Sequence, residues 1–145
     1  MENLNLDLGI KEYRLTENGV LRFNPSDPNV YNRFLDVEGK IRKVEQEMAE
    51  KAKGVQEDAG EAAIRIMGEA DAKFKDILNA VYGHGNDFHT ILEGVNLMAV
   101  GNNGNRIIDN LLDVLTPIME QGAKAFAESE ISNAKLNREQ RRALQ

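Results

Sequence analysis

The chain of 145 residues contains no cysteine and no tryptophan, and it has only three prolines and two histidines. Without cysteine it can form neither disulfides nor thiolate metal sites. No apolar run approaches the roughly 18 residues that a transmembrane helix needs. The acidic segment Met1–Leu8 also lacks the apolar core of a signal peptide. We therefore expect a cytoplasmic protein that neither spans nor binds a membrane.

The overall composition is that of a folded protein. Hydrophobic residues make up 41% of the chain and charged residues 29%, which argues against wholesale disorder. A length of 145 residues suffices for one domain with a real core. The net charge of −6 favours solubility and gives no reason to expect nucleic acid as a partner.

Six apolar residues repeat at the spacing 4-3-4-3-4, which places them along one side of a helix. They are Val30, Phe34, Val37, Ile41, Val44 and Met48. We expect this helix to run from about residue 28 to 53, with Asp27 as its N-cap and Pro28 in its first turn. Such a stripe must be buried against other helices or against another copy of the chain. We therefore predict that these six residues bind a partner.

Three further helices are expected. After a break or bend between Gly54 and Gly60, a second striped helix spans residues 57–82. Its inward positions are Ala63, Met67, Ala70, Phe74, Ile77 and Val81. A third helix spans residues 87–100, capped by Asn86 or Asp87, with an inward face of Phe88, Ile91, Leu92, Val95 and Met98. A fourth spans about 105–133, with a kink or break near Asp113–Pro117. The polar tail that follows it can add a short last helix.

The first part of the chain has the alternation of β-strands instead. Asn18-Gly19 lies between two alternating runs, which predicts a β-hairpin over residues 11–24 because both residues tolerate positive φ. Residues 3–8 are a candidate third strand. The predicted fold is mainly α: an N-terminal β-hairpin followed by a four- to five-helix antiparallel bundle with two coiled-coil-like helices. One domain would cover residues 1–134, and residues 135–145 would form a basic C-terminal tail or short helix.

No group of residues predicts catalysis or a cofactor. His84 and His89 are five positions apart and do not share a helical face, and a metal site would need a further ligand such as Asp87 or Glu93. The glycine-rich segments lack the lysine and serine or threonine of a phosphate-binding loop. The many carboxylates are expected on solvated faces. We therefore predict a non-enzymatic protein without a metal or cofactor.

A basic cluster occupies residues 135–142 of this acidic chain, and it includes Arg138, Arg141 and Arg142. Two interpretations carry about equal weight. The cluster can be a solvated terminal helix whose cations favour the C-terminal end of the helix dipole. It can equally be a docking tail for an acidic or helical partner, in which the three arginines bind that partner. Nucleic acid is a weaker third interpretation, since the cluster contains no aromatic residue.

Two segments carry a resemblance to a known family. Residues 20–35 combine the end of the hairpin with Asn-Pro-Ser-Asp-Pro and Val-Tyr-Asn-Arg-Phe, and residues 136–142 read Leu-Asn-Arg-Glu-Gln-Arg-Arg. In these segments and in its layout the chain resembles tail assembly chaperones of siphophages that infect Gram-positive bacteria. The resemblance implies a non-enzymatic protein that coats the tape measure protein, helps to recruit the tail tube protein, and leaves the finished tail.

The resemblance also implies a place in the host cell cytoplasm, and in that family a longer form is often made by translational frameshifting. We expect a homo-oligomer. The alternative function is a structural virion component, such as a minor tail or head–tail connector protein, which oligomerises through its helices. A small helical regulator whose basic tail contacts nucleic acid is a third possibility.

Overall fold

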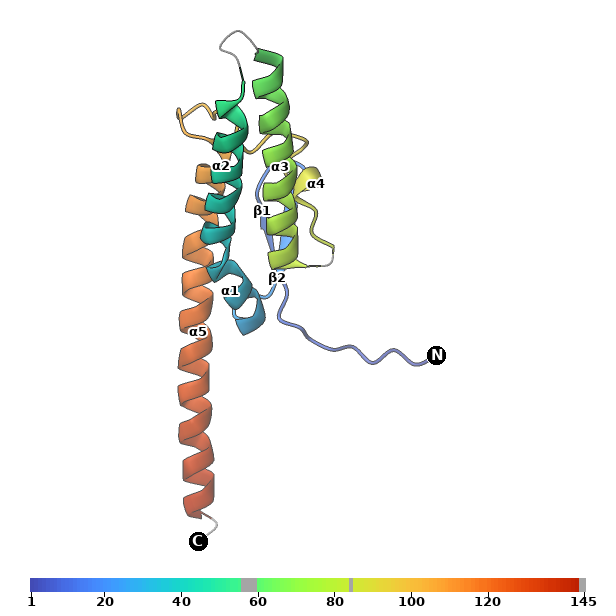
Figure 1. Ribbon diagram of the computed structural model, residues 1–145. Helices are drawn as coiled ribbons and strands as arrows, with labels where there is room; N and C mark the ends of the chain where they lie inside the picture. Colours follow the sequence, from blue (N-terminus) through green and yellow to red (C-terminus); the bar gives the residue numbers. More distant parts are fainter. Residues whose placement is uncertain (56–59, 84, 144–145) are drawn as a thin grey trace.

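The computed structural model describes residues 1–55, 60–83 and 85–143, and it confirms a mainly helical fold with an N-terminal hairpin (Figure 1). Within these residues two strands precede five helices. Their bounds are β1 Lys11–Arg14, β2 Val20–Phe23, α1 Pro28–Leu35, α2 Val37–Lys53, α3 Gly60–Tyr82, α4 Phe88–Ile91 and α5 Ile107–Ala143. The second striped helix was predicted from residue 57, and its residues 57–59 lie outside the described part.

The predicted hairpin is present, but its turn differs from the predicted one. β1 and β2 are antiparallel, with Lys11 opposite Phe23. Neither Asn18 nor Gly19 has a positive φ. Gly19 is needed for another reason: a Cβ there would collide with the carbonyl oxygen of Ile91. The turn therefore packs directly against the end of α4.

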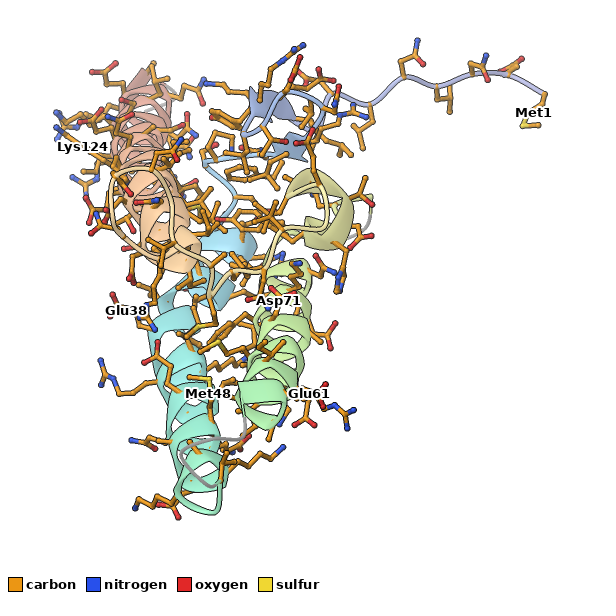
Figure 2. The ribbon with its side chains drawn as sticks, turned by 90° about the horizontal axis from the view of Figure 1, so that it is seen from above. Met1, Glu38, Met48, Glu61, Asp71 and Lys124 are labelled. Atoms are coloured by element: carbon orange, nitrogen blue, oxygen red, sulfur yellow. The ribbon has the colours of Figure 1, made fainter. Side chains whose placement is uncertain are left out.

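The predicted third strand is wrong. Residues 1–10 form neither strand nor helix, and they run outward from the body as an extended arm that ends at Met1 (Figures 1 and 2). An alternating sequence becomes a strand only where a neighbouring strand pairs with it, and β1 pairs with β2 alone. The arm lies where no such neighbour is present.

The predicted helix over residues 28–53 is two helices. Asp27 caps α1 as expected, accepting the backbone N–H of Asn29 at 2.9 Å. At Asp36 the backbone N–H turns to the carbonyl of Arg33, three residues back. α2 starts at the next residue, so the apolar stripe continues across a tight turn and changes direction there.

α2 and α3 pack on each other as an antiparallel pair (Figure 1). The sequence leaves open whether the two striped helices pair within one chain or between two copies, and the structure pairs them within one chain. Two ion pairs between exposed side chains show the register: Glu47 pairs with Lys73 at 3.2 Å, and Lys51 pairs with Glu69 at 2.6 Å. One helix advances by four residues as the other goes back by four. The predicted inward face of α3 is correct from Ala70 onward and wrong before it. Ala70, Phe74 and Val81 are buried and Ile77 is half-buried, whereas Ala63 and Met67 are exposed.

The predicted helix over residues 87–100 shrinks to the single turn α4. Asp87 caps it, and the N–H of His89 that its carboxylate accepts lowers the pKa of that carboxyl. Glu93 and Gly94 then adopt left-handed conformations, and the Gly94 N–H closes the turn on the His89 carbonyl at 3.0 Å. Beyond this stop Leu97 is buried, while Val95 is exposed.

α5 runs without a break from Ile107 to Ala143. Of the predicted kink or break near Asp113–Pro117, the break is therefore wrong, and so is the separate C-terminal helix, because residues 135–143 are the end of α5. Pro117 is exposed, so the Asp113 carbonyl that it leaves without a helical N–H can be hydrated. The first half of α5 packs on the body, and the second half extends beyond it (Figure 1). All residues from 124 to 143 are exposed.

The last buried residue of α5 is Gly122, and it is buried because α5 crosses the chain at Pro25 there. A Cβ on Gly122 would collide with the Pro25 carbonyl. The stripe that α5 turns to the core is Ile108, Leu111, Leu115, Met119 and Gly122. Its spacing continues to Phe126 and then reaches the polar residues Ser129 and Asn133. The helix thus stops packing on its own body where its apolar stripe ends.

Gly122→Ala should destabilise the protein, whereas Gly68→Ala should stabilise it. Both glycines lie inside helices, and alanine improves helix propensity by about 0.5–1 kcal/mol. At Gly68 a Cβ meets open space, so only this gain remains. At Gly122 the backbone of Pro25 must move, at a cost of about 1–3 kcal/mol. Urea unfolding of the two variants measures the difference, and equal effects would contradict the close approach of α5 to Pro25.

Candidate functional site

The described residues hold no group of three or more histidine, cysteine, aspartate or glutamate side chains that could bind a metal ion. His89 is exposed on α4. His84 is the other histidine considered above as a metal ligand, and it lies outside the described residues.

One ion pair is buried. Lys75 is 1% exposed. Its ammonium donates to the Asp71 carboxylate at 2.8 Å and to the Val95 carbonyl at 3.0 Å. The other carboxylate oxygen of Asp71 accepts the backbone N–H of Leu97 at 2.7 Å. Each charge is thus held by the other and by the backbone of the segment after α4. The Lys75 side chain is closed to solvent and the Asp71 side chain is 14% exposed. The pair fastens that segment to α3, which is a structural role.

Asn86 is the second buried polar side chain. Its amide accepts the backbone N–H of Arg22 at 2.9 Å and donates to the Arg22 carbonyl at 2.7 Å. It therefore covers the edge of β2 that faces away from β1, as a neighbouring strand would. Next to it, Tyr82 packs against Phe23 and Phe88, and burial raises the pKa of its phenol. These groups hold the hairpin on α3 and α4.

The first surface groove lies at the free end of the α2–α3 pair, and we call it the tip groove. Its lining is Met48, Ala49, Ala52 and Val55 from α2 and the turn after it, with Ala63, Ile66 and Met67 from α3. It encloses about 250 Å³. Met67 is 44% exposed, and Met48 lies between the two helices (Figure 2). None of the seven lining residues can ionise, so the groove can bind apolar surface and cannot perform acid–base chemistry.

The second groove lies between α1 and α5, and we call it the α1–α5 groove. Tyr31, Phe34, Leu35, Val37 and Glu38 line one side, and Leu112, Thr116 and Glu120 line the other. It encloses about 210 Å³. Its apolar floor is flanked by two exposed carboxylates, Glu38 and Glu120. An apolar segment with positive charges is the complement of this groove.

The structure separates the residues that the sequence predicts as partner-binding. Val30, Val37, Ile41 and Val44 are buried inside the chain, and of these four only Val37 lines one of the two grooves. Phe34 and Met48 are half-buried, and each lines one of the two grooves. Arg138, Arg141 and Arg142 are exposed on the last turns of α5, away from the stripe (Figure 1). Their role as partner-binding residues stays a prediction.

No protein-family model matches this chain, and searches of the curated proteins and of the solved structures found no match either. In the described residues no helix is both long and apolar enough to cross a membrane.

Asp71→Ala should cost about 3 kcal/mol or more of unfolding free energy, because it leaves the Lys75 ammonium buried without its counter-charge. Lys75→Met should cost less, since it fills a similar volume and leaves Asp71 bonded to the Leu97 N–H. Urea unfolding followed by circular dichroism measures both. Lys51→Ala, which removes an exposed ion pair, is the control. If Asp71→Ala were as mild as the control, the pair would not be buried in solution.

Proposed function

We propose that this chain is a non-enzymatic tail assembly chaperone that binds helical segments of a tape measure protein in the host cytoplasm during phage tail assembly. The tip groove is the observation that carries the proposal. It is open, apolar and built by two antiparallel helices. Such a groove accepts the apolar face of a third helix. Recruitment of the tail tube protein belongs to the same proposal through the family resemblance.

The spacing of the lining residues supports a helical client. Met48, Ala52 and Val55 stand four and three residues apart along α2 and the turn after it, and Ala63 and Met67 stand four apart on α3. These intervals are those of a helix seam, so a third helix can lay its own apolar residues between them. The alanines allow close approach. The two methionines adapt to side chains of different shape, which suits a protein that must bind many successive segments of a long client.

A structural virion component, such as a minor tail or head–tail connector protein, is the second candidate function. It is favoured by the N-terminal arm, where Leu4, Leu6, Leu8 and Ile10 are all exposed. Their alternation would put four apolar side chains on one face of a strand. β1 pairs on one edge only with β2, so its other edge is open to strand addition within the described fold. An arm that pairs permanently with a neighbour in the virion would explain both features.

Met67→Glu should abolish binding of the tape measure protein and leave the fold intact. The side chain lies in the tip groove and is already partly exposed, so a carboxylate there costs the chain little but must be desolvated under a client helix. The measurement is co-expression with the tape measure protein, followed by pull-down and by the soluble fraction of the client. Ile64→Glu is the matched control, since Ile64 is exposed on the same helix but does not line the groove.

Two outcomes would contradict this assignment. Equal loss of binding in both variants would mean that general surface hydrophobicity, and not the tip groove, holds the client. No complex with the wild-type chain, together with its presence in purified virions, would replace the chaperone by the structural component.

A further inference from the structure

A continuous stripe runs along the side of α5 that faces away from the core. It consists of Asp109, Asp113, Thr116, Glu120, Ala123, Ala127, Ile131, Ala134, Arg138 and Arg141, and we call it the α5 outer stripe. The intervals are three or four residues throughout, so all ten side chains share one face of the helix. Thr116 and Ala123 are half-buried and the other eight are exposed.

The charges on this stripe are ordered by sign. Its first part carries the carboxylates Asp109, Asp113 and Glu120, and its last part carries the guanidinium groups of Arg138 and Arg141. Small and apolar residues lie between them. A second copy of the same helix is complementary to this order when it runs antiparallel, because acidic residues then oppose basic ones. A parallel copy would place like charges together.

The α1–α5 groove continues the same surface. Thr116 and Glu120 belong both to the groove and to the α5 outer stripe. The groove adds the apolar side chains of Phe34, Leu35 and Leu112 and the carboxylate of Glu38. An antiparallel helix laid on the stripe would therefore fill the groove as well, and its basic end would lie among these carboxylates.

The second half of α5 has the properties of a helix that would fill the α1–α5 groove of another copy. All its residues from 124 to 143 are exposed, so this half has no packing partner within the described chain. Most of the stability of a helix in a protein comes from the packing of one face, which this half lacks within the described chain. It carries the apolar Ile131 and two alanines on the stripe, followed by Arg138 and Arg141. Its apolar residues match the apolar floor of the groove, and its arginines match the carboxylates of Glu38 and Glu120 beside that floor.

We propose that two copies of this chain form a symmetric dimer in which the second half of each α5 lies antiparallel along the α1–α5 groove of the other copy. The two-fold axis passes beside Ala127. Around this centre Ala123 faces Ile131 of the second copy, Glu120 faces Ala134, and Asp113 faces Arg141. Arg138 lies opposite Thr116, between the carboxylates of Glu120 and Asp113. The contact is isologous, as closed dimers require.

This dimer goes beyond the proposed chaperone function, because it uses neither the tip groove nor a client. It also differs from oligomerisation through the stripe of Val30 to Met48, most of which is buried inside one chain. In this register the paired stripe residues run from Asp113 to Arg141, so the two helices share a seam of about 42 Å at 1.5 Å per residue. A seam of that length, repeated by symmetry on both grooves, is long enough for a specific interface.

Disulfide trapping tests the direction and register, since the chain has no native cysteine. Ala123→Cys and Ile131→Cys should cross-link efficiently when the two variants are mixed, and poorly when either is oxidised alone. In the antiparallel dimer each residue lies beside the other position, and the two copies of one position are about 12 Å apart along the axis. Strong cross-linking of either variant with itself would show a parallel pair and overturn the proposal.

Charge reversal tests the complementarity in the uncross-linked protein. Arg141→Glu and Asp113→Arg should each weaken dimerisation at least tenfold, and the double variant should regain most of the wild-type affinity because the pair is restored with opposite polarity. Size exclusion with light scattering over a concentration series gives the dissociation constants. Arg65→Glu is the matched control, as Arg65 is exposed on α3 and outside both surfaces.

Circular dichroism of each variant separates a lost dimer from a lost fold, and all the changed residues are exposed or half-buried. A wild-type chain that stays monomeric at high micromolar concentration would overturn the proposal. A dimer that responds to Arg65→Glu as much as to Arg141→Glu would do the same. Neither result would bear on the tip groove, whose test is binding of the client.

Discussion

The fold depends on one buried ion pair. Asp71 and Lys75 stand one turn apart on α3 and hold the backbone of Val95 and Leu97, on the side of α3 that Figure 2 shows facing the segment before α5. Leu97 in turn accepts the backbone N–H of Ile108 at 2.9 Å, in the first turn of α5. The start of the longest helix is therefore placed by a buried ammonium and the mostly buried carboxylate that pairs with it. Since breaking such a pair is far more costly than losing a surface pair, α5 begins at a fixed point.

A second point fixes the direction of α5. Gly122 lies against the Pro25 carbonyl, so the helix is held both at its first turn and four turns later. Two fixed points determine its axis, and the exposed half beyond Gly122 must continue along it (Figure 1). The α1–α5 groove exists because α1 starts three residues after Pro25 and lies beside this axis. The surface proposed for dimerisation is thus a consequence of how the core places α5.

Local patterns predicted the elements that local interactions determine. Asp27 and Pro28 mark the start of α1, and the periodic stripes predict that α2 and α3 are helices with one buried face. Periodicity alone does not determine that these two faces pack on each other within one chain. The residues after Asp87 also have helical spacing, but the left-handed Glu93 and Gly94 end the helix. Beyond them the Asp71–Lys75 pair bonds the Val95 carbonyl and the Leu97 N–H, which stabilises a non-helical backbone there. From the sequence that pair looks like any surface pair four residues apart. The grooves need the packed helices, so no single pattern could have revealed them.

The order of charges on α5 links the two proposals. The tip groove and the free half of α5 lie at opposite ends of one chain (Figure 1). An antiparallel dimer would then carry its two tip grooves at its two far ends, facing opposite ways. A long helical client could bind both grooves of one dimer, or the grooves of successive dimers. Binding at the second groove would then be intramolecular, so weak, adaptable contacts at each groove would add up to tight binding without any strong single site.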